Sequence, residues 1–152
     1  MDNHKTEKFS IERANWRDYL ALSALEKTSF SSQDSWPFWD IFGILVLPEY
    51  VRLKAVIDGY MVGFVGGERD TAQRIGWIIT IATLPEFRCQ GIGMALLSAC
   101  ETALDMPVIR LTVRGSNESA IKLYQSADYK PVKRWKGYYQ GGEDGLVFEK
   151  RR

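Results

Sequence analysis

The stretch Arg88-Cys89-Gln90-Gly91-Ile92-Gly93 decides the fold, because it joins two segments of different periodicity. Before it, residues 75–84 are rich in β-branched and apolar side chains, which favour a strand. After it, apolar residues recur at helical spacing, at Ile92, Ala95, Leu96, Ala99, Cys100, Ala103 and Leu104. Pro107 ends this helix, and residues 108–114 again predict a strand. We expect a right-handed strand–helix–strand crossover with two parallel strands.

The two glycines of this stretch also predict a binding site. Glycine removes side chains where a ligand could approach the backbone, and a helix beginning near Gly91 presents unpaired N–H groups. The partial positive charge of that helix end suits a pyrophosphate. Two glycines alone would be more typical of tight packing at the start of a helix than of a binding site. Because no Lys follows Gly93 and the GxGxxG spacing is absent, a P-loop triphosphatase and a Rossmann dinucleotide fold are disfavoured.

Upstream of the crossover, the sequence predicts two helical segments and two strand regions. Residues 9–14 alternate as a short strand, and Asn15 can cap a helix that ends near Lys27. Residues 28–39 predict a loop, followed by a short helical piece to about residue 45. Asp58-Gly59 predicts a hairpin turn between strands at 51–57 and 60–67, with a second turn at 68–73.

Downstream, Asn117 can cap a helix with a broad apolar face, and two strands follow at 130–139 and 146–150. The order of elements predicts an α/β domain of three layers around a mostly antiparallel sheet. At 152 residues, the chain is expected to form one domain over residues 1–152.

Composition excludes several classes of protein. The net charge of +1 gives no strong global field for nucleic acid or an anionic membrane. The two cysteines and the single His4 make a disulfide framework or a metal site improbable, and they favour a reducing, cytoplasmic location. The N-terminus lacks a signal-peptide core, and the apolar run at 41–48 is too short to span a bilayer. We therefore expect no nucleic-acid or membrane partner, and a monomer or homodimer.

Two blocks carry a resemblance to a known family. Residues 81–97, around the quoted stretch, resemble the core motif R/Q-x-x-G-x-G/A of the GCN5-related N-acetyltransferase (GNAT) family, and residues 117–124 resemble its next motif. The resemblance covers about residues 9–150. The C-terminal part is most similar to RimI-type ribosomal-protein-alanine acetyltransferases and their eukaryotic protein N-terminal relatives, through Val113-Arg114-Gly115-Ser116-Asn117 and residues 138–145. It implies a three-layer α/β/α fold with a mixed, mostly antiparallel central sheet.

The resemblance implies acetyl-CoA as the acetyl-donor cosubstrate, bound where the two crossover strands splay apart. Backbone groups of Ile81, Ala82 and Thr83 would bind the pantetheine arm and polarise the thioester carbonyl. Main-chain N–H groups of the glycine turn would hold the pyrophosphate, at Arg88, Cys89, Gln90, Gly91, Ile92, Gly93 and Met94. The Arg88 side chain could add a charged contact or be solvated. Asn117 could reach the pantetheine or only cap its helix.

For catalysis, the resemblance assigns to Tyr124 the donation of a proton to the departing thiolate, although a tyrosine on an apolar helix face is more often a core residue. RimI-type enzymes carry a carboxylate twelve residues before this tyrosine, and here Thr112 stands there. A threonine hydroxyl is a poor base, so packing or holding a water is its expected role. Water-relayed bases could be Glu26, Asp34 or Glu68, although a carboxylate of this kind is more often an ordinary surface residue.

The acceptor is expected to be a primary amine. An α-amine has a pKa of about 7.7–8.0 and is roughly one-third neutral near pH 7.5, whereas a lysine amine is only about 0.1% neutral. The missing carboxylate therefore favours a protein or peptide N-terminus. Tyr138 and Tyr139 would contact it, as the family's paired tyrosines do, or would simply end a strand. A small-molecule amine as acceptor and a non-catalytic acyl-CoA-binding module remain the alternatives.

Several other residues could have either a functional or a purely structural role. Phe30, Trp36 and Trp39 could wall the acceptor pocket or belong to the core. Cys89 has no His nearby to activate it, so it is not expected to be a nucleophile, and Cys100 falls on the apolar helix stripe. The basic cluster is typical of a solvated sheet edge, though it could meet an acidic acceptor or cofactor phosphates; it comprises Lys130, Lys133, Arg134 and Lys136.

Overall fold

A seven-stranded mixed sheet runs through the computed structural model, which describes residues 8–29 and 38–152. The strands are β1 (Ser10–Arg13), β2 (Tyr50–Ile57), β3 (Tyr60–Asp70), β4 (Ile75–Thr83), β5 (Val108–Arg114), β6 (Lys130–Trp135) and β7 (Gly145–Arg151). The helices are α1 (Tyr19–Ser29), α2 (Phe38–Val46), α3 (Ile92–Leu104) and α4 (Glu118–Ser126), with short 3-10 turns η1 (Trp16–Asp18) and η2 (Pro85–Phe87).

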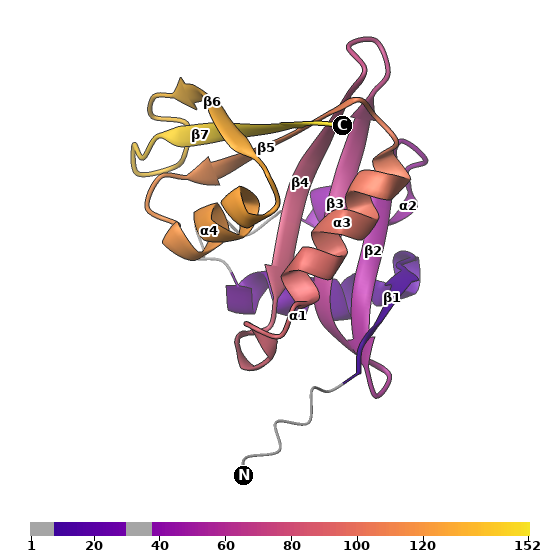
Figure 1. Cartoon of the computed structure of the whole chain (residues 1–152). Coiled ribbons are helices and arrows are strands. Elements are labelled where there is room, and N and C mark those ends of the chain that lie inside the picture. The colour runs from indigo at the N-terminus through magenta and orange to yellow at the C-terminus, as the bar shows by residue number, and fades with distance from the viewer. Residues whose placement is uncertain (1–7, 30–37) are drawn as a thin grey trace.

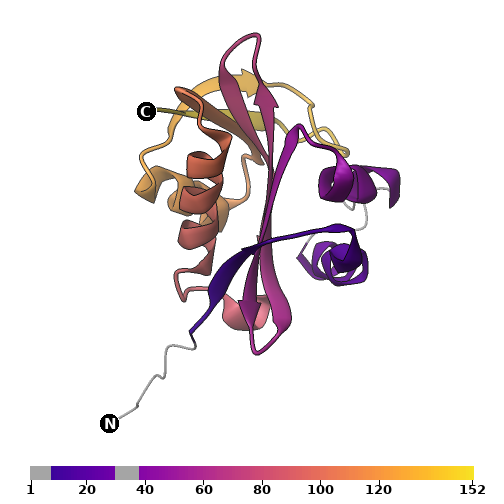
Figure 2. The ribbon, with the colours of Figure 1, turned by 90° about the vertical axis from the view of Figure 1, so that its right-hand side faces the viewer.

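The sheet has the order β1-β2-β3-β4-β5-β7-β6, and helices cover both of its faces. Figure 2 shows α1 and α2 on one side of the sheet and α3 and α4 on the other. One core cluster lies under α3 and α4, and a smaller one lies between β3, β4, α1 and α2. The predicted three-layer α/β/α fold is therefore confirmed.

Only the β4–β5 pair is parallel, and the other neighbouring strands are antiparallel. These two strands flank α3 in the chain, so the crossover and its mixed, mostly antiparallel sheet are as the sequence predicts. The apolar stripe of α3 explains its position, since Ile92, Leu96 and Cys100 are buried against the sheet.

The predicted elements occur, with three differences at their ends. Asn15 caps the first helical segment in a reciprocal capping box with Asp18, but the first turn is a 3-10 turn before α1. The strand β3 continues to Asp70 rather than ending at residue 67, because Glu68 and Asp70 pair with β4. The strand β6 stops at Trp135 rather than at residue 139, because the next residues turn at Gly137, whose φ is +63°.

A buried carboxylate ties α3 to the C-terminal strands. Glu101 accepts a hydrogen bond of 2.8 Å from the Tyr129 hydroxyl and forms an ion pair of 3.0 Å with Lys150 of β7. Burial and this contact with Glu101 raise the pKa of Tyr129 well above its ordinary value, so the phenol remains a donor. A partnered carboxylate satisfies the rule that buried charges need counter-charges or hydrogen bonds.

We expect Tyr129→Phe to destabilise the protein by about 2 kcal/mol, because it removes a buried hydrogen bond to a charged acceptor. The midpoint of urea unfolding should fall while the slope m stays unchanged. An unchanged midpoint would show that the Lys150 ion pair alone satisfies Glu101.

Candidate active site

The parallel strands β4 and β5 pair only at their beginnings and then separate. Their paired residues run from Ile75–Val108 to Ile78–Leu111, and Figure 1 shows their arrowheads well apart. Beyond that point Ile81, Ala82 and Thr83 pair with β3 on one side only of β4. This opening lies next to the start of α3, so the structure brings together the two backbone segments to which the sequence assigned acetyl-CoA.

The start of α3 has the geometry of an anion site. Gly91 is the N-cap with a φ of +85°, no side chain caps the helix, and a Cβ at Gly91 would meet no atom within 4 Å. The amides of Ile92, Gly93 and Met94 are the first of α3 and have no carbonyl one turn earlier to bond to. Cys89 also has a positive φ of +61°, and it is exposed. Gln90 completes this turn between η2 and α3.

Two polar side chains predicted for the cofactor also support the local structure. The Nε of Arg88 donates to the carbonyl of Thr83 at 3.2 Å, which ties the glycine turn to the end of β4. The Oδ1 of Asn117 accepts from the N–H of Ala120 at 3.2 Å, so Asn117 does cap α4. Gly93 allows α4 to approach, because a Cβ there would lie 3.3 Å from Leu123.

Glu26 is a buried carboxyl on α1 that faces β4. Its exposed fraction is 3%, and its Oε1 accepts a hydrogen bond of 3.1 Å from the hydroxyl of Thr80. Thr80 immediately precedes Ile81, so Glu26 lies beside the opened part of β4. Burial raises the pKa of Glu26 to about 7, although the Thr80 hydrogen bond opposes the shift. Within the described residues, its Oε2 and the nearby Ser29 hydroxyl are buried without a hydrogen-bond partner.

Tyr124 lies on α4 with an exposed fraction of 5%. Its ring packs against those of Tyr129 and Phe148, with centroids 6.1 and 6.4 Å away. Burial, and then the proximity of Tyr139, raise the pKa of Tyr124 well above its ordinary value. The phenol therefore stays protonated at neutral pH and can donate a hydrogen bond or a proton.

The loop between β6 and β7 carries the two predicted acceptor residues. The rings of Tyr138 and Tyr139 meet edge to face at 5.0 Å, and Tyr138 is 54% exposed. Glu143 holds this loop on the turn before α4, through an ion pair of 3.0 Å with Arg114 and a bond of 2.8 Å from the N–H of Ser116. The pairing keeps the pKa of Glu143 below its ordinary range, chiefly through the contacts with Ser116.

Thr112 has a packing position. It faces Val147 of β7, and the side chains of Thr112 and Tyr138 both come close to Gly145. A Cβ at Gly145 would lie 3.0 Å from Thr112 and 3.0 Å from Tyr138, so the glycine is needed for this approach. The position where RimI-type enzymes carry a carboxylate thus lies in the sheet surface beneath the acceptor loop.

The structure separates the candidate bases. Glu68 pairs with Trp77 near the start of β4, on the far side of the β-bulge from the opening, whereas Glu26 lies at the opening. Asp34, Phe30 and Trp36 lie outside the described residues, as does the side chain of Trp39. The spacing along α1 could have indicated that Glu26 is buried. Leu22, Leu25 and Glu26 have the i, i+3, i+4 spacing of one buried helix face.

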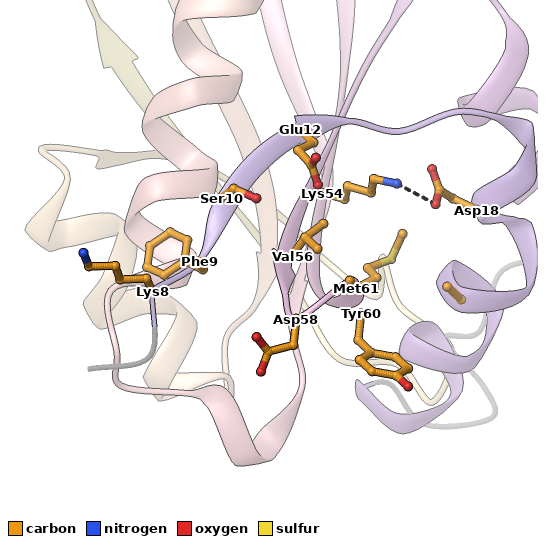
Figure 3. Close-up of a pocket in the computed structure, with 12 residues that line it drawn as sticks. Lys8, Phe9, Ser10, Glu12, Asp18, Lys54, Val56, Asp58, Tyr60 and Met61 are labelled. Carbon is orange, nitrogen blue, oxygen red and sulfur yellow. Dashed lines mark hydrogen bonds and ion pairs between the residues drawn. The ribbon is translucent and has the colours of Figure 1, made fainter. Parts of the chain in front are cut away.

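A separate hollow of about 600 Å³ lies between β1, the β2–β3 hairpin and α1 (Figure 3). None of the predicted site residues that the structure describes lines it. Lys54 and Asp18 form an ion pair of 2.8 Å across it. The hollow is therefore distinct from the region where β4 and β5 separate.

Two further findings concern only residues 8–29 and 38–152. In these ranges no helix is long and apolar enough to cross a membrane. The same ranges hold no cluster of three or more His, Cys, Asp or Glu side chains that could bind a metal ion.

Comparison with known proteins places this geometry in a family. The model of the "Acetyltransferase (GNAT) family" matches residues 11–129. The chain is 33% identical to the "N-terminal acetyltransferase B complex catalytic subunit NAA20" of Arabidopsis thaliana, over 93% of this chain and 84% of that protein. It is 29% identical to an "N-alpha-acetyltransferase" of Saccharolobus solfataricus, over 96% of this chain and 95% of that protein.

A solved structure of the same fold is the ribosomal-protein-S18-alanine N-acetyltransferase from Escherichia coli. The TM-score is 0.85 at 23% identity, and the match covers 95% of this chain and 94% of that chain.

Proposed function

The chain belongs to the GNAT family of acetyltransferases and is an acetyl-CoA-dependent N-acetyltransferase, and from this premise we propose that its acceptor is the N-terminal α-amine of a protein or peptide. The observation that carries the proposal is the buried Glu26, whose pKa of about 7 suits removal of a proton from an amine of pKa about 7.7–8.0. The names of the relatives, which are N-alpha-acetyltransferases, support the same acceptor.

The two backbone segments beside the separation of β4 and β5 are the proposed cofactor-binding residues. We assign the pyrophosphate to the main-chain N–H groups of residues 88–94, where the helix end supplies partial positive charge. The pantetheine arm would pair with Ile81, Ala82 and Thr83 along the edge of β4 that faces away from β3. The Nε of Arg88 is used on Thr83, so its contribution is to shape the turn.

We expect Gly91→Ala to weaken acetyl-CoA binding about tenfold, because the added methyl group enters the open space in front of the α3 amides. It should also cost about 1–2 kcal/mol of stability, since Gly91 has a left-handed φ. Calorimetric titration gives the Kd. Gly59→Ala is the matched control, because Gly59 has a φ of +81°, also faces open space, and lies in the β2–β3 turn. An equal loss of affinity in both variants would contradict the assignment.

In the proposed mechanism, Glu26 accepts the amine proton through one water. The buried Oε2 of Glu26 and the hydroxyl of Ser29 offer that water two polar partners. The acceptor reacts as the neutral amine: its nitrogen attacks the thioester carbonyl carbon, and Glu26 takes the extra proton from that nitrogen, through the water, as the C–N bond forms. Backbone N–H groups of β4 stabilise the charge on the carbonyl oxygen. The C–S bond breaks, the leaving thiolate takes a proton from Tyr124, and the proton held by Glu26 passes through solvent water to restore the phenol.

Tyr124 is the proposed donor to that thiolate. It is protonated across the neutral range, and its burial strengthens a hydrogen bond to a developing negative charge. Tyr138 and Tyr139 would contact the acceptor backbone beside it, on a loop held by the Arg114–Glu143 ion pair.

The experiment that tests the acceptor is free-thiol release from acetyl-CoA over a panel of amines. We expect turnover with peptides that begin with Ala or Ser and little with polyamines, amino acids or aminoglycosides. The reverse pattern would establish the small-amine alternative. We further propose that the chain acts as one domain in the cytoplasm, as a monomer or homodimer.

A further inference from the structure

The strands β5, β7 and β6 carry several positively charged side chains on the side of the sheet opposite α3; Lys130 and Lys133 of β6 are exposed, whereas Val147 and Glu149 of β7 between them and β5 are buried. The register aligns Arg110, Glu149 and Lys130 in one row across these strands. Thr112, Val147 and Lys133 form the next row, and Arg114, Gly145 and Trp135 the third. Trp77 of β4 pairs with Arg110 and extends the first row.

This face, here called the basic face, has more cations than carboxylates. Glu149 is shared between Arg110, at 2.7 Å, and Arg151, at 3.0 Å. Among the residues that the structure describes, the exposed Lys130 and Lys133 form no ion pair. The surplus is local, because the whole chain has a net charge of only +1.

Aromatic rings connect the basic face to the proposed acceptor site. From Tyr139 the contacts run to Tyr138 at 5.0 Å and then to Trp135 at 5.1 Å. The Nζ of Lys133 lies 5.8 Å from the centre of the Trp135 ring, and Trp77 stacks on Trp135 at 6.3 Å. A peptide that leaves Tyr139 in an extended conformation, at about 3.3 Å per residue, would reach Lys133 in about five residues.

A solvated sheet edge is the simpler account of these lysines. It explains their charge, but it does not explain why Lys133 lies over Trp135 on the same face as Tyr138, in the row of Thr112. Arg134, which the register places on the opposite face, is instead neutralised by Asp144 at 3.0 Å.

We propose that the basic face binds acidic side chains of the acceptor, at about its fourth to sixth residues counted from the acetylated amine. The proposal rests on the proposed function, since it places the α-amine near Tyr139. Opposite charge attracts the acceptor, and the apolar rings give its backbone a surface to lie on. The enzyme then prefers N-termini followed by Asp or Glu.

The test compares peptides with the same first three residues and with Asp, Asn or Lys at the next three. For the wild-type protein, kcat/KM should be about tenfold higher for the Asp peptide than for the Lys peptide, and the gap should shrink as salt rises. Lys130→Glu/Lys133→Glu should reverse the order. Arg17→Glu, an exposed cation on η1 near β1, is the matched control and should keep the wild-type order.

A three-residue acceptor separates this inference from the proposed function. Equal turnover of it in all variants shows an intact reaction site, and a wild-type order of the longer peptides in the double variant then overturns the basic face. No turnover of any peptide would contradict the proposed function instead. In that case, fluorescence anisotropy of the labelled Asp peptide, measured with coenzyme A present, tests the basic face without turnover. Binding that is lost in the double variant supports the basic face, and equal binding in both proteins overturns it. Preferred binding of an RNA oligonucleotide would also overturn it.

Discussion

Glu26→Gln is expected to lower kcat/KM about 10²- to 10⁴-fold, the usual contribution of a general base. The amide keeps the shape of the side chain and can still accept from Thr80, but it cannot take a proton. The Kd for acetyl-CoA should not change, since Glu26 lies on α1 and not at the start of α3. Initial rates with an Ala-starting peptide measure the effect.

The pH dependence of kcat/KM is a second test of the same variant. Both Glu26, with its pKa of about 7, and the acceptor amine must lose a proton, so log kcat/KM of the wild type should rise with a slope of about two at low pH. Glu26→Gln should show a slope of about one, from the amine alone. An unchanged slope would remove Glu26 from the role of base.

The free energy of unfolding should fall as the pH rises, whereas kcat/KM rises. The pKa of Glu26 is raised in the folded protein, so the native state binds more protons than the unfolded state between about pH 4.5 and about pH 7. Stability therefore falls as pH rises through that window, by about 3 kcal/mol at most. Glu26→Gln lacks this slope, and thermal unfolding at pH 5 and pH 8 would show it. A variant that loses activity and unfolds at or above the wild-type temperature at pH 8 has not failed by misfolding.

Tyr124→Phe is the other change with a large expected effect. It should lower kcat about 10²-fold, because it removes one preorganised donor at the site of developing charge, and leave the Kd for acetyl-CoA nearly unchanged. The buried ring is kept, so its packing against Tyr129 and Phe148 should persist. Pre-steady-state thiol release measures the chemical step directly.

The neighbouring Tyr129 supplies the control. Its hydroxyl is bound to Glu101, so Tyr129→Phe should lower stability but not kcat. Tyr124→Phe should thus lower kcat and leave stability nearly unchanged, whereas Tyr129→Phe should lower stability and leave kcat unchanged. If Tyr124→Phe kept kcat within about twofold of the wild type, the thiolate would have to leave with help from another donor.

The crossover could be predicted from sequence because its signals are local. The helical spacing of the stripe after Gly91 and the strand run before it each lie within one element. The end of β6 could not be predicted in this way. Gly137 turns the chain there, and its N–H donates a hydrogen bond of 3.0 Å to the carboxylate of Asp144. That contact depends on how the loop folds back on itself.

The candidate base could be named but not ranked from sequence. Whether Glu26 is an ordinary surface carboxylate depends on α1 packing against β4, and its partner Thr80 is 54 residues away. Thr112 departs from the RimI-type pattern, and in the structure its side chain and that of Tyr138 both lie close to Gly145. The carboxylate that the sequence lacked on β5 has a buried counterpart on α1.

The most direct test uses one peptide that carries both a free α-amine and one lysine. After incubation with acetyl-CoA at pH 7.5, tandem mass spectrometry locates the acetyl group. We expect acetylation at the α-amine, with the lysine unmodified. Acetylation at the lysine, with the α-amine left free, would contradict it.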